Sequence, residues 1–198
     1  CERRSRLVTT LGLSARNIRQ EMAQRIIAVG GEPASGKSTL MKRMIKEYMP
    51  LKTFTYGLVR GLYSKENETY FIGIYDNSVF CGTDKLSMAV QPDFIKLLNR
   101  KPEATFVFEG DRLFNQSLFD QKQCEIFVLE VSEETLQARH EQRQDNQTDK
   151  FKKAKHTKIK NIKENNAVTI LPNNTLEESE TCFNTILKAI RNEQNRTA

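Results

Sequence analysis

Several residue types that define specialised proteins are scarce in this chain. Its 198 residues include no tryptophan and two histidines, and the four cysteines show no C-x-x-C spacing. A zinc site is therefore not expected. Three of the cysteines lie inside apolar runs, as small core residues do, which fits a reducing compartment, so we expect a cytoplasmic protein, of the host cytoplasm if phage-encoded. No apolar run approaches the eighteen or more residues that a membrane helix needs, so no membrane partner is expected.

Positive charge is concentrated at the N-terminal end. The formal net charge is +6, and residues 1–21 supply half of it, with five arginines against two glutamates. We exclude this basic leader from the fold as an added or disordered segment, and we place a single domain at residues 22–198. Its arginines could instead form a nucleic-acid arm.

The most informative motif follows a short apolar run at Ile26–Val29. The next segment, Gly31–Ser38, reads G-E-P-A-S-G-K-S and matches G-x-x-x-x-G-K-[ST] at every defined position, with an amphipathic helix pattern after it. In such a P-loop, backbone N–H groups cradle phosphates, the lysine reaches the β- and γ-phosphates, and the hydroxyl binds Mg²⁺. The sequence therefore predicts a nucleoside triphosphate partner, with ATP and Mg²⁺ as cofactors. The predicted nucleotide-binding residues are Gly31, Glu32, Pro33, Ala34, Ser35, Gly36, Lys37, Ser38 and Thr39.

A later apolar run, Thr105–Phe108, ends abruptly in charged residues that include Glu109, Asp111 and Arg112. The carboxyl ends of parallel strands border the nucleotide crevice in folds of this kind. We therefore predict that one carboxylate serves Mg²⁺ and the other deprotonates or orients an acceptor hydroxyl, with the assignment between them open. The predicted metal ligands are Ser38 and Glu109. An ordinary acidic turn is the alternative interpretation.

Between these motifs, two β-rich runs flank a polar turn. Tyr70–Tyr75 and Val79–Cys81 predict a β-hairpin inserted at about residues 68–84. Such an insertion could form a wall of the acceptor pocket, although a purely structural hairpin is equally compatible with the pattern. The polar loop after it contributes Thr83, Asp84 and Lys85 as predicted acceptor contacts.

A strongly basic segment precedes the last strand pattern. Seven lysines lie between Lys150 and Lys163, with apolar residues at helical spacing among them. We interpret residues 139–163 as a helical lid that closes cations onto the triphosphate, and a solvated helix surface is the alternative. Charge on the transferred phosphoryl group is predicted to be stabilised by Lys37, Arg112, Arg139 and Arg143. Predicted acceptor contacts in the lid are Lys152 and Lys155.

The order of these patterns predicts an α/β fold. We expect a three-layer P-loop fold with a mainly parallel five-stranded sheet, the hairpin insertion and the basic lid. The expected strands are residues 26–29, 52–59, 105–108, 124–131 and 167–171. Thr175 and Glu178 form a capping box that opens the last helix.

Three stretches, G-T-D-K-L-S-M-A-V-Q-P, F-V-F-E-G-D-R-L-F-N and H-T-K-I-K-N-I, resemble motifs of phage-encoded P-loop kinases, including the 5-hydroxymethyluracil DNA kinases. The order of elements over residues 25–190 is also similar to that of small P-loop nucleoside and nucleotide kinases. The chain departs from the phage motifs at Lys85 and His156, where arginines are expected.

This resemblance implies an ATP-dependent phosphotransferase with an alcohol acceptor. The acceptor that it suggests is the hydroxymethyl group of 5-hydroxymethyluracil in phage DNA, so DNA carrying modified bases is a candidate partner. A kinase of a free nucleoside, nucleotide or other small molecule is the first alternative. An NTP-hydrolysing regulatory switch is the second, and a monomer or a homodimer is expected in each case.

Overall fold

The computed structural model describes residues 24–76, 78, 81–142 and 148–191. Within them the seven strands are β1 (Arg25–Gly31), β2 (Lys52–Tyr56), β3 (Val59–Ser64), β4 (Thr69–Ile72), β5 (Thr105–Glu109), β6 (Glu125–Glu130) and β7 (Val168–Pro172). The six α-helices are α2 (Lys37–Glu47), α3 (Val90–Arg100), α4 (Gln116–Phe119), α5 (Glu133–Gln142), α6 (Asp149–Asn165) and α7 (Leu176–Arg191). The basic leader and Arg143 lie outside the described residues. None of the described helices combines the length and apolarity needed to span a membrane.

The strands form one sheet in the order β2-β3-β4-β5-β1-β6-β7. Five of them, β4, β5, β1, β6 and β7, run parallel, while β2 and β3 continue the sheet in antiparallel pairs. The predicted count of five strands was therefore wrong, since the sheet has seven. The mainly parallel character was predicted correctly.

The predicted strand at 52–59 is corrected, whereas the predicted hairpin at 68–84 is only partly described, because Val79 and Phe80 of its second arm lie outside the described residues. Gly57, with φ 55°, makes a turn with Leu58 that divides the first run into the antiparallel pair β2 and β3. Tyr70–Ile72 belongs to β4, which pairs in parallel with β5 and is buried throughout. Among the described residues of the 68–84 segment, an isolated antiparallel bridge joins Ile74 to Gly82. Tyr70–Ile72 thus pairs in parallel with β5 on one side and antiparallel with β3 on the other, so β3 is its antiparallel partner in the described part of the chain.

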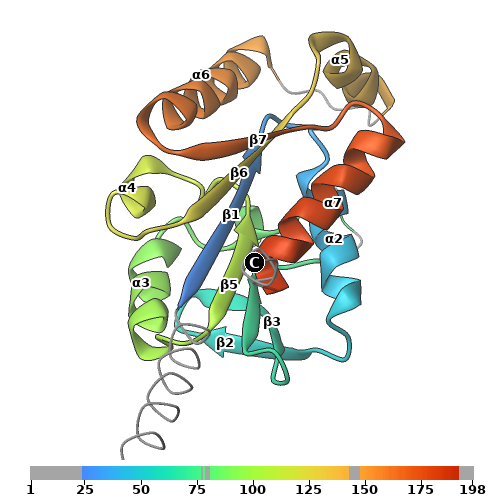
Figure 1. Cartoon of the computed structure of the whole chain (residues 1–198). Coiled ribbons are helices and arrows are strands. Elements are labelled where there is room, and N and C mark those ends of the chain that lie inside the picture. The colour runs from blue at the N-terminus through green and yellow to red at the C-terminus, as the bar shows by residue number, and fades with distance from the viewer. Residues whose placement is uncertain (1–23, 77, 79–80, 143–147, 192–198) are drawn as a thin grey trace, which may run out of the picture.

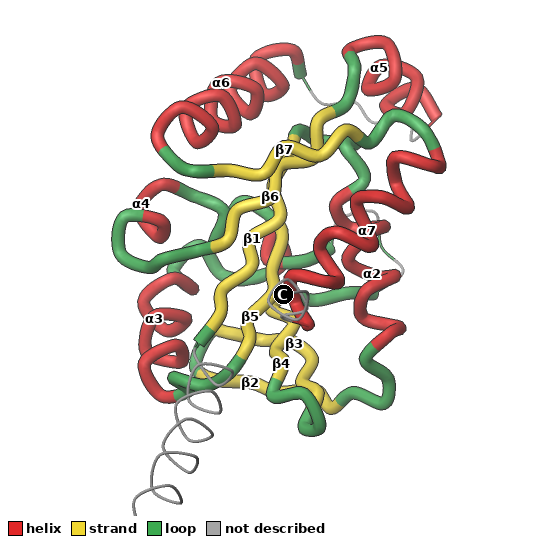
Figure 2. Tube along the Cα trace, viewed as in Figure 1, coloured by secondary structure: helices red, strands yellow, loops and turns green. Residues whose placement is uncertain are grey.

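Helices cover both faces of this sheet and complete a three-layer fold (Figure 1). One core cluster packs α3, α4 and α6 against one face, through side chains such as Phe94, Leu118 and Ile162. The other packs α2 and α7 against the opposite face, through Met44 and Ile186 among others. In Figure 2 the parallel strands run through the middle of the molecule, with α5 and α6 near the end at which β6 leaves the sheet.

Two helices follow their sequence signals closely. At the start of α7, the Glu178 backbone N–H donates to Thr175 Oγ1 over 3.1 Å, and the Thr175 N–H donates to Glu178 Oε2 over 3.2 Å. The predicted capping box is therefore formed. The lysine-rich segment is a helix, α6, capped by Thr148 Oγ1, which accepts from the Phe151 N–H.

Candidate active site

The phosphate-loop motif connects the end of β1 to the start of α2. Gly31 has φ 140° and Gly36 has φ 97°, backbone angles that glycine adopts readily and other residues rarely do. A Cβ on Gly31 would lie 2.7 Å from the Leu129 carbonyl oxygen, so no side chain fits there. The Ser35 N–H donates to the Glu32 carbonyl over 3.1 Å and closes the loop. The chain thus makes a tight turn directly before a helix N-terminus, a geometry suited to phosphate.

Lys37 opens α2 and folds back over the loop. Its Nζ donates to the carbonyl oxygens of Gly31 over 2.9 Å and Glu32 over 2.7 Å, and to Ser35 Oγ over 3.3 Å. These contacts hold the ammonium group beside the turn. A triphosphate bound by the loop would lie next to this ammonium group.

Ser38 connects the phosphate loop to the end of β5. Its hydroxyl donates to Glu109 Oε1 over 3.0 Å, and Glu109 is 1% exposed. The parallel register of β1 and β5 sets Val29 opposite Glu109, which explains why residues 71 positions apart meet here. Burial raises the pKa of Glu109 to about 7, and the negative charges of Asp84 and Asp111 add to the rise, while Lys37 and Ser38 oppose it.

Asp111 lies two residues further on, after a turn at Gly110 with φ 104°. Its backbone N–H donates to Asp84 Oδ1 over 2.6 Å, and Thr83 Oγ1 donates to the Glu109 carbonyl over 2.9 Å. The predicted acceptor loop is thereby held against the end of β5. Three carboxylates, those of Asp84, Glu109 and Asp111, gather beside the phosphate loop.

Two lysines of α6 reach Asp111 from above the sheet edge. Lys155 pairs with Oδ2, and Lys158 Nζ lies 3.0 Å from Oδ1. Burial acts to raise the pKa of Asp111, but the two ammonium groups outweigh it and the pKa is lowered. The side chain of Asp111 remains 30% exposed, so this carboxylate is reachable from solvent while Glu109 is not.

Arg139, at the end of α5, supports the loop from the opposite side. It donates to the carbonyl oxygens of Asn173 over 2.8 Å and Ala34 over 3.4 Å. Asn173, which is 4% exposed, donates its side-chain N–H to the Ser35 carbonyl over 2.7 Å. Arg139 and Asn173, which directly follows β7, therefore hold the phosphate loop in place.

The other residues predicted to belong to the site contact neighbouring parts of the chain or make no side-chain contact. Arg112 donates to the Leu86 carbonyl over 3.4 Å, and Lys85 pairs with Asp76. Thr83 is fully buried, so its contact is with the chain itself. The side chain of Lys152 makes no hydrogen bond or ion pair with the described residues. Pro33 and Thr39 lie within the loop and the first turn of α2.

Two contributors, Lys158 and Asn173, were absent from the predicted site residues. Lys158 lies three residues after Lys155, a spacing that sets both side chains on one face of a helix, and this signal was available. Asn173 follows the carboxyl end of β7, the edge at which α/β folds bind ligands. Its burial against the Ser35 carbonyl has no counterpart in the sequence pattern.

The pair formed by Ser38 and Glu109 fits a magnesium ion. Mg²⁺ takes oxygen ligands and is usually bound through one or two protein groups, with phosphates and waters completing its shell. A buried carboxylate with a raised pKa gains from a nearby divalent cation, which favours its ionised form. No group of three or more histidine, cysteine or acidic side chains in the described part of the chain is arranged to hold a metal by itself.

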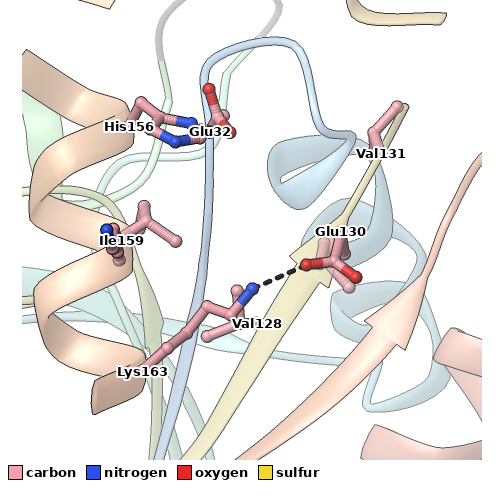
Figure 3. Close-up of a pocket in the computed structure, with 9 residues that line it drawn as sticks. Glu32, Val128, Glu130, Val131, His156, Ile159 and Lys163 are labelled. Atoms are coloured by element: carbon pink, nitrogen blue, oxygen red, sulfur yellow. Dashed lines mark hydrogen bonds and ion pairs between the residues drawn. The ribbon is translucent and has the colours of Figure 1, made fainter. Parts of the chain in front are cut away.

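A pocket of about 370 Å³ lies between α6, the end of β6 and Glu32 of the phosphate loop. In Figure 3, Lys163 points from α6 to Glu130, with an Nζ–Oε1 distance of 2.6 Å. On the same helix, His156 Nδ1 lies 3.0 Å from Glu32 Oε1. The His156 pair therefore connects α6 to the phosphate loop, while its lysines connect it to the end of β6 and to the turn after β5.

The comparisons with known proteins add little detail. No family model matches the sequence, and no curated protein matches it. Among solved structures, a gluconokinase from Sinorhizobium meliloti 1021 is similar with a TM-score of 0.44 and 13% identity, over 88% of this chain and 99% of that one. A similarity at this level carries no conclusion about activity, so the function proposed below rests on the residues of this chain.

Proposed function

We propose that this protein is a P-loop kinase that transfers the γ-phosphate of ATP to a hydroxyl group. The observation that carries the proposal is the contact between Ser38 and Glu109, at 3.0 Å. It couples the phosphate loop to a strand end that also presents Asp111. A nucleotide-binding loop, a metal-binding pair and a reachable carboxylate are the parts that phosphoryl transfer to an alcohol needs.

The roles of the two carboxylates follow from their surroundings. Glu109 is buried against Ser38, so these two would hold Mg²⁺, which supplies positive charge to the phosphates when bound. Asp111 is ionised and reachable, so it would orient the acceptor hydroxyl and take its proton. Because the transition state of phosphoryl transfer is loose, a carboxylate of low pKa suffices as the base.

The transfer step is a substitution at the γ-phosphorus. A bond forms between the acceptor oxygen and phosphorus, the bond to the β-phosphate oxygen breaks, and ADP leaves. The acceptor proton passes to Asp111. Lys37, Lys155 and Lys158 carry positive charge that can stabilise the phosphoryl group in the transition state of the transfer.

Among acceptors, a small hydroxyl compound is favoured over a DNA base. Lys155 and Lys158 are engaged with Asp111, and Lys163 with Glu130, so these cations face the site and not a free surface. Four of the seven lysines, Lys150, Lys152, Lys153 and Lys160, remain to bind a polymer, and within the described part of the chain none of the four contacts the groups assigned to catalysis. A 5-hydroxymethylated base in DNA is the second candidate, supported by the exposed Lys150 and Lys153 and by the motif resemblance.

Transfer of labelled γ-phosphate tests the proposal. The panel contains polyols, sugar acids, nucleosides, nucleotides, plain DNA and DNA with 5-hydroxymethyluracil. We expect labelled product from a small alcohol, with weak dependence on salt. Labelling of modified DNA alone, falling steeply as salt rises, would favour the second candidate. Hydrolysis of ATP with no transfer to any acceptor would favour a regulatory switch instead.

A further inference from the structure

A second cavity, of about 180 Å³, lies near the acceptor side of the candidate active site. Its walls come from the turn between β2 and β3 and from the loop after Asp84. The lining residues are Gly57, Leu58, Arg60, Lys85, Leu86 and Ser87. None of the roles assigned above involves Arg60 or the β2–β3 turn.

Both walls of this cavity are held in place by specific hydrogen bonds. On one side, the Leu58 N–H donates to Asp93 Oδ2 over 3.0 Å, which ties the β2–β3 turn to α3. On the other, the Leu86 N–H donates to the Thr83 carbonyl over 2.9 Å, and Arg112 donates to the Leu86 carbonyl. The cavity is therefore built between two fixed segments.

The charges that line the cavity are positive. Arg60 is exposed, and its side chain makes no hydrogen bond or ion pair with the residues that the structure describes. Lys85, which is 27% exposed, pairs with Asp76, which is 49% exposed, so an anion in the cavity would compete with a half-exposed carboxylate for this ammonium group. The nearby Asp93 is engaged with Leu58 and with Lys96, at 3.1 Å. Arg60 thus supplies a positive charge that no acidic side chain of the described chain balances.

The sheet register relates this cavity to the reacting groups. The Gly73 N–H donates to the Arg60 carbonyl over 2.8 Å, which places Gly73 beside Arg60. Since Ile72 pairs with Phe108, the next residues, Gly73 and Glu109, stand at the same level of the sheet. Two strand spacings then separate Arg60 from Glu109, a backbone distance of about 10 Å. Lys85 also follows directly after Asp84, which contacts Asp111. The cavity therefore adjoins the end of β5 that carries Glu109, and the loop that contacts Asp111 forms one of its walls.

We propose that this cavity binds an anionic group of the acceptor, a phosphate or a carboxylate, through Arg60 and Lys85. The inference rests on the proposed kinase function, because it describes the molecule that carries the reacting hydroxyl. It narrows the substrate class to hydroxyl compounds that also bear a negative charge. Guanidinium and ammonium groups are the side chains best suited to such a group, and Ser87 offers a further hydroxyl near them.

Binding of an anion can be measured separately from catalysis. The protein is first saturated with Mg²⁺ and the non-hydrolysable ATP analogue AMP-PNP, so that the phosphate loop is filled, and inorganic phosphate is then titrated by calorimetry. We expect saturable binding that weakens about tenfold or more in Arg60→Ala, since a charged hydrogen bond is lost. Lys65→Ala is the matched control, because this exposed lysine follows the opposite end of the same strand, and its affinity should equal that of the wild type.

Kinetics test the same site with acceptors that differ in charge. Pairs such as a nucleoside and its 5′-monophosphate, or a sugar alcohol and the matching sugar acid, are compared in wild type and Arg60→Ala. We expect the charged member to be preferred, and Arg60→Ala to raise its KM about tenfold while the KM for ATP is unchanged. If the anion belongs to a DNA backbone instead, Arg60→Ala reduces the salt slope measured with modified DNA by about one.

The outcomes separate the two proposals. Equal phosphate affinity in wild type and Arg60→Ala, or preference for neutral acceptors, overturns the anion site and leaves the kinase function standing. Failure of the protein to bind AMP-PNP, or absence of transfer to any acceptor, overturns the kinase function and the anion site with it.

Discussion

Replacement of Glu109 by glutamine should stabilise the protein at alkaline pH, relative to its effect at acidic pH, while lowering its activity. Burial raises the pKa of this carboxyl from its ordinary 4.5 to about 7. The folded protein therefore holds this proton more tightly than the unfolded chain does. Between pH 4.5 and 7 the unfolded state loses the proton first, so the free energy of unfolding falls as pH rises. Because glutamine cannot ionise, the free energy of unfolding of the Glu109→Gln variant does not fall with pH for this reason.

The expected change in the free energy of unfolding follows from the shift in the pKa of Glu109. At 1.36 kcal/mol per pKa unit, moving from 4.5 to about 7 corresponds to about 3 kcal/mol, of which roughly 2–3 kcal/mol falls between pH 5 and pH 8. Urea denaturation of the metal-free, nucleotide-free protein at these two pH values measures it. The quantity compared is the stability difference between Glu109→Gln and wild type, which should grow by that amount at pH 8.

Comparing variant with wild type cancels the contributions of other titrating groups. Glu66→Gln serves as the control, because Glu66 is exposed in the turn between β3 and β4 and its replacement should leave the pH dependence unchanged. If Glu109→Gln and wild type lose stability in parallel from pH 5 to pH 8, then Glu109 is not a buried carboxyl with a raised pKa. The assignment of this residue to the metal would then lose its physical basis.

Three further predictions concern activity. Lys37→Ala should lower phosphotransfer by about 10²-fold or more with an unchanged circular dichroism spectrum, and normal turnover would refute the phosphate-loop assignment. Asp111→Asn should lower kcat with little change in the KM for ATP and no rescue by added Mg²⁺, whereas raised Mg²⁺ should partly rescue Glu109→Gln; equal responses would refute the division of roles. In the double variant Lys155→Ala with Lys158→Ala, the pKa of Asp111 should rise, so the acidic limb of the pH–rate profile should move to higher pH; an unmoved limb would show that Asp111 does not titrate in catalysis.

The parts of the fold that sequence reasoning predicted correctly depend on local patterns. A few adjacent residues are enough to specify the apolar face of α2, the strand that ends at Glu109 and the capping box of α7. Such signals act over one or two turns, and the tertiary structure did not override them. The lysine-rich helix α6 was also predicted from its apolar stripe, of which Ile159 and Ile162 are buried.

The errors arose where the pattern was ambiguous. The run from Lys52 to Val59 has the composition of one strand, and Gly57 was predicted to lie within it. In the structure Gly57 has a positive φ and belongs to a turn that divides the run into two strands. Tyr70–Ile72 was assigned to a hairpin with the run after the polar turn, yet this buried strand pairs antiparallel with β3, which precedes it, and in parallel with β5. Periodicity indicates that a segment is extended, but it does not show which strand will be its partner.

Contacts within the site were the least predictable part. Glu109 and Ser38 were both named from the sequence as metal ligands, because each belongs to a recognisable strand end or loop. The ion pairs of Lys155 and Lys158 with Asp111 join residues more than forty positions apart, and no spacing rule specifies them. Seven lysines lie in this stretch, and only their geometry on α6 distinguishes those that face the site.

The opposite pKa shifts of Glu109 and Asp111 have one structural origin. The two residues are separated only by Gly110, whose φ of 104° turns the chain at the end of β5. The turn leaves Glu109 inside the sheet edge, where burial dominates, and brings Asp111 out under α6, where two lysines dominate. The pKa of the Glu109 carboxyl thereby stays at about 7 beside Ser38, and a divalent cation bound there would favour its ionised form. The Asp111 carboxylate stays ionised and partly exposed. A single turn thus gives two neighbouring carboxyl groups the distinct properties that the proposed phosphoryl transfer would use.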